Sequence, residues 1–322
     1  MNMRLIVATT LAGVALTAPV TAQTWPTKPI SVIAAFAPGG TVDLFARVLA
    51  PALTKLLGQS VLVENRGGAG GTLATAQVAR ATPDGYTLLA HHMGIAFNAS
   101  LYEKLPYDTL RDITPIVYVG YTPNILVVTN SFPPKTVDEF LAAARATPGA
   151  INYGTGGIGS AGHLPVELLQ TLANVKLTHV PYKGSGPAVA DLLSGQIQTM
   201  LLTLPAIMSH VQGGKVRALA TSGAKRTKLL PNLPTLAEAG VKGFDYEPWF
   251  GFFAPAKTTA AVLDRFHAAV NVALEEPSLR DKLVAQGLEV GTLSRAEFTR
   301  IVQTDTAKWA KLIKQLGIKA GE

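Results

Sequence analysis

The order of apolar and polar positions along the chain predicts strands that alternate with helices. Residues 30–36 form a short apolar run rich in β-branched side chains, which is typical of a buried parallel strand. Pro38, Gly39 and Gly40 interrupt this run, and residues 41–57 then carry apolar side chains at helical spacing up to Gly58. Further strands are expected at 61–63 and 86–90. Between them we expect the glycine-rich loop 67–71 and a helix that ends near residue 81.

The same order begins again in the middle of the chain. Helices are predicted at 137–146, about 161–172 and 187–193, and after Phe253 the chain is mostly helical. The accompanying strands are predicted at 125–128, 151–153, 177–180, 197–202, 216–221 and 249–253. Repeated strand–helix order predicts parallel-rich sheets flanked by helices.

Two similar units, each with a glycine-rich strand-to-helix turn, predict a two-lobed α/β protein with a ligand cleft between the lobes. The C-terminal helices are expected to return to the first lobe. We predict lobe 1 at residues 23–123 and 247–322, and lobe 2 at residues 124–246.

The N-terminus predicts export. Arg4 precedes an uncharged apolar run from Leu5 to Val20, and Ala22 follows as a small residue that a signal peptidase accepts. The run is shorter than the roughly 20 residues that a membrane-spanning helix needs. We therefore expect residues 1–22 to be a cleaved signal peptide. The chain contains no cysteine, which excludes disulfides, thiolate metal sites and a thiol nucleophile.

The charge of the chain favours a small anionic ligand over a nucleic acid. The formal net charge is +7, but only 15% of the residues are charged and no lysine- or arginine-rich run occurs. Nucleic-acid binding relies on clustered basic residues, so the composition argues against it.

The first candidate site is the turn from Phe36 to Asp43. A sharp turn from the end of a strand into a helix leaves backbone N–H groups without partners, and the positive end of the helix dipole lies there. Such a turn holds a carboxylate or a phosphate, and Gly39 and Gly40 let it approach the backbone. The alternative is a tight turn in which Thr41 or Asp43 is an ordinary helix cap.

The second candidate site is the loop from Gly154 to Ser160. It has the spacing of a dinucleotide-binding loop, but no acidic residue follows about twenty positions later, as that function requires. Thr155, Gly159 and Ser160 therefore favour anion binding from the second lobe. Tyr182 and Lys183 follow a strand at the same edge, where they either contact the anion or lie in a solvated turn.

Two alternative functions, a serine hydrolase and a metal-binding protein, receive less support. Ser160 and His163 are close in sequence, but the segment lacks the first glycine of the serine-hydrolase nucleophile elbow. His91 and His92 are adjacent on a strand, so their side chains point to opposite faces, and one of them is expected to face the cleft. No carboxylate–histidine set accompanies them, so neither a metal nor a cofactor is predicted.

An ordered series of motifs extends over nearly the whole mature chain. The motifs are WPTKPI at 25–30, FAPGGTVD at 36–43, VENRGGAGG at 63–71, PDGYTLL at 83–89, LPYD at 105–108, GTGGIGSAGHL at 154–164, HVPYKGSGPA at 179–188, GKVRALA at 214–220, LPTLAEAG at 233–240 and FAPA at 253–256. Together these motifs resemble the Bug family, the substrate-binding components of tripartite tricarboxylate transporters.

The resemblance implies a periplasmic, type II-like binding protein that closes on its ligand without chemistry. It implies that the two turns grip a ligand carboxylate, partly through water, and that membrane permease subunits receive the ligand. Family ligands include dicarboxylates, tricarboxylates, acidic amino acids and aromatic carboxylates, and the family favours a monomer. The residues implied as ligand contacts are Phe36, Gly39, Gly40, Thr41, Asp43, Thr155, Gly159, Ser160, His163, Tyr182 and Lys183.

The chain departs from the family pattern at two places. Gly67 stands where a proline is usual, and His91 and His92 stand where small polar residues are commoner. We include His91 among the ligand contacts and expect a histidine here to meet a second carboxylate or an aromatic ring of the ligand. A sensor that presents ligand to a signalling receptor has the same fold and stays open as an alternative.

Overall fold

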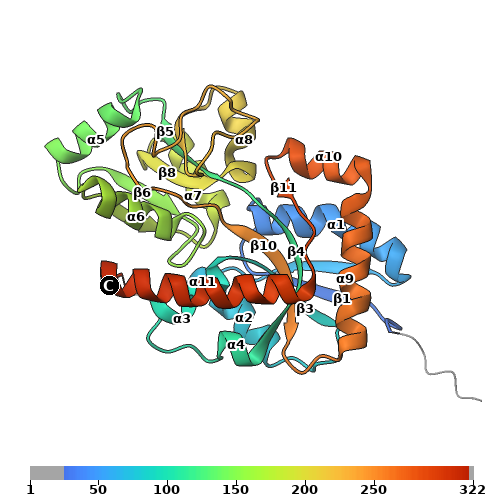
Figure 1. Ribbon diagram of the computed structural model, residues 1–322. Coiled ribbons are helices and arrows are strands. Elements are labelled where there is room, and N and C mark those ends of the chain that lie inside the picture. Colours follow the sequence, from blue (N-terminus) through green and yellow to red (C-terminus); the bar gives the residue numbers. More distant parts are fainter. Residues whose placement is uncertain (1–24, 319–322) are drawn as a thin grey trace, which may run out of the picture.

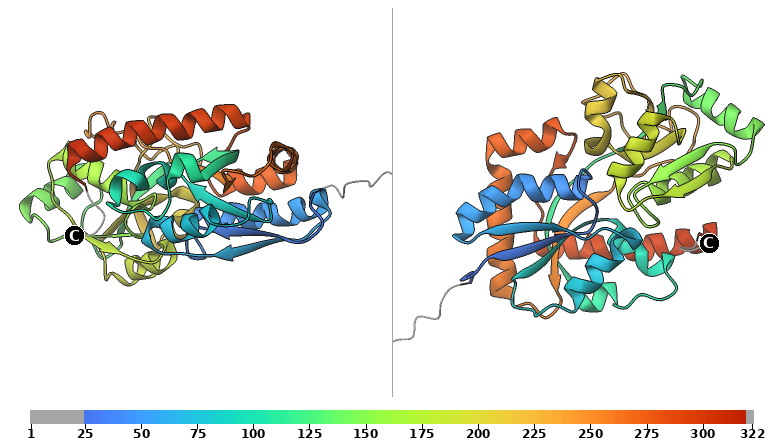
Figure 2. Two further views of the ribbon diagram at one scale, coloured as in Figure 1. Left: turned by 90° about the horizontal axis from the view of Figure 1, so that it is seen from below. Right: turned by 180° about the vertical axis from the view of Figure 1, so that it is seen from behind.

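The computed structural model describes residues 25–318 and shows two lobes, each built on one β-sheet flanked by helices (Figures 1 and 2). The α/β class and the two-lobed architecture predicted from the sequence are confirmed. The predicted signal peptide, residues 1–22, lies outside the described residues.

The first lobe contains a six-stranded sheet in the order β11-β4-β10-β3-β1-β2. β1 pairs in parallel with β2 and β3, whereas β10 runs antiparallel to both β3 and β4. The strands are β1 Ile30–Ala34, β2 Val61–Asn65, β3 Thr87–His92, β4 Ile113–Tyr121, β10 Trp249–Pro255 and β11 Glu289–Val290.

The second lobe contains a five-stranded sheet in the order β7-β6-β8-β5-β9. Here β6 pairs in parallel with β7 and β8, whereas β5 runs antiparallel to β8 and β9. The strands are β5 Asn124–Thr129, β6 Asn152–Thr155, β7 Thr178–Pro181, β8 Thr199–Thr203 and β9 Val216–Thr221.

Helices cover the faces of both sheets. In the first lobe α9 packs on α1 and β4, and α11 packs on α3 and β4, so the C-terminal helices lie on the lobe that also contains β1 (Figure 1). The helices are α1 Thr41–Leu57, η1 Ala69–Gly71, α2 Thr72–Ala79, α3 Gly94–Leu101, α4 Thr109–Asp112, α5 Val137–Ala146, α6 His163–Ala173, α7 Ser185–Ser194, α8 Leu204–Gln212, α9 Ala260–Glu275, α10 Pro277–Ala285 and α11 Arg295–Leu316.

Both sheets contain more antiparallel pairing than the repeated strand–helix order indicates. In each lobe one long strand, β10 or β5, enters from the other lobe and runs against its neighbours. The sequence reasoning also gave no strand to β4, which lies between β10 and β11. Pro115 and Gly120 interrupt the apolar run of β4, and its pairing with β10 has register shifts where the backbone is irregular.

The chain crosses between the two sheets at residues 122–123 and again on the way from β9 to β10. At the first crossing the Thr122 hydroxyl donates a hydrogen bond to the Gly287 carbonyl at 2.6 Å. This bond ties the crossing to the segment between α10 and β11. The exact bounds predicted for the two lobes stay a prediction.

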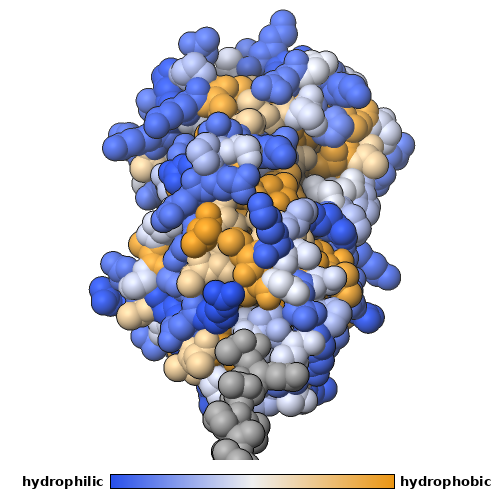
Figure 3. Space-filling model, turned by 90° about the vertical axis from the view of Figure 1, so that its right-hand side faces the viewer, coloured by the Kyte–Doolittle hydropathy of each residue, from blue (hydrophilic) through white to orange (hydrophobic). Residues whose placement is uncertain are grey.

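Within residues 25–318, none of the helices combines the length and the apolar character that a membrane crossing requires. Figure 3 shows a face on which hydrophilic residues surround smaller groups of hydrophobic ones. The surface of this face is therefore mixed in character.

Candidate functional site

Four helix N-termini converge on one small cavity between the lobes. α1 contributes Gly40, Thr41 and Val42, and α7 contributes its first residue, Ser185. Thr203 stands at the N-cap position of α8. The remaining lining residues are Phe36, His92, Ser160, Ala161 and Phe250, of which Ser160 and Ala161 directly precede α6.

None of these four helices has a side-chain hydrogen bond at its N-cap. The first N–H groups of a helix have no partner within the helix, and together they carry a partial positive charge. Their convergence makes the cavity a site for an anion. No lysine or arginine is among the lining residues, so the attraction for an anion comes from backbone dipoles and neutral hydrogen-bond donors.

The structure corrects the prediction that Thr41 or Asp43 caps α1. The N-cap residue is Gly40, and Thr41 is the first residue of the helix. The Thr41 hydroxyl instead lies 2.7 Å from the hydroxyl of Thr203, which belongs to the second lobe. Thr41 therefore joins the two walls of the cavity.

Asp43 stabilises the first turn from a position outside the cavity. Its carboxylate accepts a hydrogen bond from the Gly39 N–H at 3.1 Å and one from Asn65 at 2.9 Å. The Arg47 Nε lies 2.7 Å from the same carboxylate. With its oxygens occupied in this way, Asp43 fixes the shape of the turn and does not line the cavity.

The second turn is held by a hydroxyl and by neutral rings, with the Glu167 carboxylate 3.9 Å from His163 Nε2. The Thr155 hydroxyl lies 2.7 Å from His179 Nε2 and accepts the Gly157 N–H at 3.1 Å. The His179 ring stacks on Tyr153 with centroids 4.8 Å apart, and on its other side contacts His163 at 4.7 Å. Burial lowers the pKa of His163 to about 3 and that of His179 to about 4, so both rings are neutral at pH 7.

The two lobes are in contact around the cavity. The Tyr102 hydroxyl donates to the Ile158 carbonyl of the opposite lobe at 2.9 Å. A Cβ added at Gly184 would lie 2.5 Å from the Cβ of Ala37, and one added at Gly70 only 2.1 Å from the Ile158 carbonyl oxygen. The structure is thus a closed form in which glycine backbones meet across the cleft.

The cavity has a volume of about 30 Å³, which is roughly the share of one water molecule in the liquid. The Ser160 hydroxyl and the His92 Nε2 are buried and have no hydrogen-bond partner in the part of the chain that the structure describes. Buried polar atoms normally have partners, so two unpaired ones at one small cavity mark it as a place for a polar ligand. A bound organic acid needs more room than this, so the lobes must separate for it to enter.

The structure brings some of the predicted contacts together and separates others. Phe36, Gly40, Thr41 and Ser160 line the cavity. Other predicted residues support the turns from behind or lie in them without lining the cavity: Gly39, Asp43, Thr155, Gly159 and His163.

Tyr182 and Lys183 lie outside the cavity lining. The Tyr182 hydroxyl donates to Asp191 at 2.5 Å, and the Lys183 side chain is exposed. Of the histidine pair, His92 lines the cavity, whereas the ring of His91 packs against Gly71, where an added Cβ would lie 2.3 Å from its Nε2. The two rings do not point to opposite faces, as alternation along β3 had predicted: their centroids lie 5.0 Å apart and both rings contact Phe36.

The sequence reasoning missed Val42, Ala161, Ser185, Thr203 and Phe250 as lining residues. Two of these carried a signal. Thr203 ends a strand and is followed by Pro205 at a helix start, and Ser185 lies in a glycine-rich strand-to-helix turn of the same kind as the two turns that were recognised. Phe250 offered no such signal, because its side chain reaches the cavity from a strand of the first sheet.

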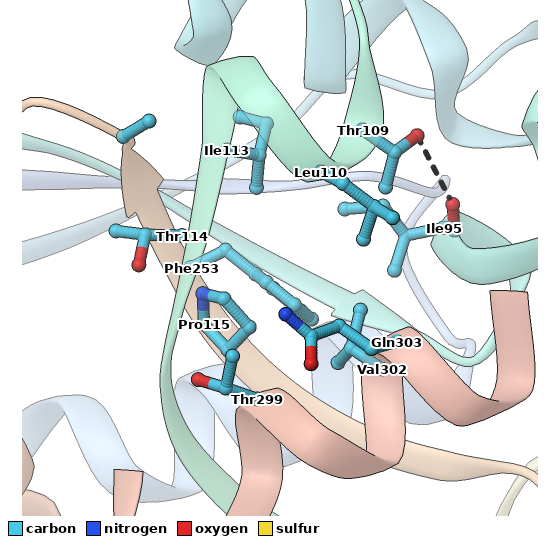
Figure 4. Close-up of a pocket in the computed structure, with 11 residues that line it drawn as sticks. Ile95, Thr109, Leu110, Ile113, Thr114, Pro115, Phe253, Thr299, Val302 and Gln303 are labelled. Carbon is cyan, nitrogen blue, oxygen red and sulfur yellow. Dashed lines mark hydrogen bonds between the residues drawn. The ribbon is translucent and has the colours of Figure 1, made fainter. Parts of the chain in front are cut away.

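A second, larger cavity of about 220 Å³ lies in the first lobe between α4, β4 and α11. Figure 4 shows Ile95, Leu110 and Phe253 around it, with Thr109 donating to the Ile95 carbonyl at 3.4 Å. Its lining contains no charged residue and no converging helix N-termini, so it does not have the features of an anion site. Among residues 25–318 no group of three metal-ligating side chains is arranged to hold a metal.

Comparison with known proteins identifies the family. A family model described as "Tripartite tricarboxylate transporter family receptor" matches residues 45–318. The chain belongs to this family. This family membership confirms the resemblance to Bug proteins that the sequence motifs indicated.

Three solved structures show how similar this receptor is to known binding proteins. The periplasmic binding protein BugD is 35% identical, covers 92% of this chain and 99% of its own, and has a TM-score of 0.89. Rpa4515 of R. palustris with adipate is 37% identical, with coverage of 92% and 99% and a TM-score of 0.88. MatC of Rhodopseudomonas palustris with bound malate is 33% identical, with coverage of 90% and 100% and a TM-score of 0.85.

Proposed function

We propose that this receptor binds one small organic carboxylate in the cleft, in the dicarboxylate or aromatic carboxylate class, and delivers it to the permease subunits of a tripartite transporter. The observation that carries the proposal is the convergence of four helix N-termini, each without a side-chain cap, on the cavity between the lobes. Two similar structures contain adipate and malate, which supports a carboxylate ligand.

The proposed mechanism is closure around the ligand. An acid held between Thr41 on one lobe and Ser160 on the other gains contacts in the closed state that the open state lacks, so binding shifts the population towards closure. The Thr41–Thr203 hydrogen bond then adds to the contacts between the lobes. We place this function in the periplasm. The N-terminal residues predict export to this compartment, and BugD is a periplasmic binding protein.

The site geometry favours binding over hydrolysis. The Ser160 hydroxyl has no hydrogen-bond partner among the described residues, and His163 Nδ1 instead lies 3.5 Å from the Gly159 N–H. A nucleophilic serine requires a base within hydrogen-bond reach. We therefore propose that Ser160 donates a hydrogen bond to the carboxylate and performs no chemistry.

A thermal-shift and calorimetric screen of the mature protein tests the proposal. The acids are malate, succinate, adipate, butyrate and terephthalate, with a neutral sugar and an amide as controls. A bound acid stabilises the folded state by about 2.7 kcal/mol at a hundredfold excess over its Kd. Stabilisation by acids alone supports the carboxylate site. Absence of any shift with the acids, or shifts only with the neutral compounds, contradicts it.

The transport role needs its own test, because a sensor would bind the same acid. Uptake of the acid identified in the screen is measured in cells with and without this receptor. Loss of uptake supports delivery to a permease. Unchanged uptake together with a lost transcriptional response to the acid would favour the sensor.

A further inference from the structure

His92 occupies a position from which a single ring atom can reach the ligand. Its ring stacks on Phe36, with centroids 4.7 Å apart and planes at 22°, and contacts the edge of Phe250 at 6.1 Å. The Gly94 backbone covers the edge that carries Nδ1 and Cε1, since a Cβ added there would lie 2.4 Å from Cε1. The edge that carries Nε2 is therefore the one left to line the cavity.

The hydrogen bond to Gly94 fixes the tautomer of this ring. The Gly94 N–H donates to His92 Nδ1 at 2.7 Å, so Nδ1 must carry a lone pair. Burial and the neighbouring His91 hold the pKa of His92 well below its usual 6.5. A neutral imidazole with Nδ1 as acceptor carries its proton on Nε2. His92 is thus an uncharged N–H donor.

This donor has no partner among residues 25–318. His92 is 3% exposed, and its Nε2 is buried without a hydrogen bond. A buried N–H without an acceptor destabilises the closed form, so a ligand that supplies an acceptor at this point gains affinity. The N-terminus of α1 and the Ser160 hydroxyl already surround the place for one carboxylate. His92 therefore faces another part of the same ligand.

We propose that His92 determines ligand specificity by donating a hydrogen bond from Nε2 to an oxygen acceptor that the bound acid carries in addition to its gripped carboxylate. The inference rests on the proposed function. It selects hydroxy acids, keto acids and dicarboxylates over simple monocarboxylates. Because no lysine or arginine lines the cavity, the site offers a neutral donor for this second oxygen and no opposite charge.

Three four-carbon acids test the proposal, because each acid in the series has one polar group fewer than the previous acid. Succinate lacks the hydroxyl of malate, and butyrate carries a methyl group where succinate has its second carboxylate. Their Kd values are measured by calorimetry with the wild type and with His92→Phe, which keeps an aromatic ring on Phe36 and removes the donor. We expect His92→Phe to reduce the malate-to-succinate or the succinate-to-butyrate preference about fivefold, as the loss of one neutral hydrogen bond predicts.

The step whose preference falls shows whether His92 contacts a hydroxyl or a carboxylate. The matched control is His210→Phe, a histidine on α8 outside the cavity lining, which should leave both preferences unchanged. If His92→Phe raises the Kd of all three acids equally, or leaves both preferences unchanged, the proposal is overturned. Absence of binding by every acid to the wild-type protein would instead contradict the proposed function.

A second measurement keeps the proposal testable if His92→Phe does not fold. In ¹⁵N-histidine-labelled wild type, nuclear magnetic resonance should show His92 with the proton on Nε2, and malate should move this resonance. The resonance that disappears in His92→Gln is assigned to His92. Because glutamine can place an amide donor near the same point, this variant should retain part of the preference among the three acids. An Nδ1-protonated ring, or an Nε2 resonance that malate leaves unmoved, overturns the proposal.

Discussion

The two turns that form the cleft are stabilised in opposite ways. In the first turn, the charged Asp43 carboxylate is paired with Arg47, whose side chain is 51% exposed. In the second turn, the rings of Tyr153, His179 and His163 form a row, and both histidines are neutral at pH 7. An ion pair near water depends little on pH around neutrality, whereas buried neutral histidines must be protonated in acid. The comparison indicates that the histidines of the second turn contribute to the loss of stability in acid.

The glycines of the two turns differ in how closely they meet the opposite lobe. In the first turn, a Cβ added at Gly39 would meet nothing within 4 Å, although Ala37 of this turn approaches Gly184. In the second turn, a Cβ added at Gly159 would lie 2.3 Å from Asn98 Oδ1, and Ile158 lies directly against Gly70 of the first lobe. Closure is therefore more sensitive to an added atom at Gly159 than at Gly39.

The largest effect is expected for Gly70→Ala. The new Cβ would lie 2.1 Å from the Ile158 carbonyl oxygen, so the lobes could not close fully. We expect the Kd for malate or adipate, measured by calorimetry, to rise about a hundredfold, which corresponds to about 2.7 kcal/mol.

The matched control for this substitution is Gly214→Ala. Gly70 has φ +62° and Gly214 φ +64°, but a Cβ at Gly214 would meet nothing within 4 Å. Both variants carry the strain of a left-handed alanine, roughly 1–2 kcal/mol, and only Gly70→Ala obstructs closure. Equal affinities of the two variants would contradict the importance of this contact.

The next effect concerns the charged brace of the first turn. Asp43→Ala removes the acceptor of the Gly39 N–H and the partner of Arg47. We expect the free energy of unfolding in urea to fall by about 2 kcal/mol, the usual loss when a buried charged acceptor is deleted. Asp264→Ala, at an ion pair with Arg295 where Asp264 is 65% exposed, should change it by less than about 0.5 kcal/mol.

The pH dependence of stability tests the neutral row of the second turn. Between pH 6.5 and its folded pKa of about 3, His163 is neutral in the folded state and protonated in the unfolded state. The unfolded state then binds more protons, so stability falls as the pH falls. From pH 6.5 to pH 5 we expect the wild type to lose about 1.5 kcal/mol more than His163→Gln.

Urea titrations at several pH values measure this difference. His91, His92 and His179 also have lowered pKa values, but they are present in both proteins and their contribution cancels. Parallel stability curves for the wild type and His163→Gln would show that His163 does not contribute to the loss of stability in acid.

The smallest effect is expected at the residues beside the second turn. Tyr182→Phe removes a hydroxyl that donates to Asp191, and Lys183→Ala removes an exposed side chain, so neither change reaches the cavity. We expect each to change the Kd for malate less than about twofold, whereas Ser160→Ala should weaken binding about fivefold through the loss of one hydrogen bond. If Lys183→Ala weakened malate binding as much as Ser160→Ala, the anion would lie closer to Lys183 than proposed.

The sequence predicted the elements with strong local signals. The helix 137–146 was predicted, and the Thr136 hydroxyl accepts the Glu139 N–H at its start. α1 ends at Leu57 as predicted, because Gly58 takes the left-handed conformation after it. β4 was missed, because its pairing partners come from distant parts of the chain.

By itself the sequence determined the α/β class, the two lobes and the two glycine-rich turns, since these follow from local periodicity and from the conformational freedom of glycine. Only the tertiary structure decided which side chains meet at the cavity. It selected His92 over His91, turned Asp43 and Tyr182 towards partners in their own lobes, and added Ser185 and Thr203. The physical reason is that helix N-termini from two lobes converge only after both sheets have formed and closed on each other.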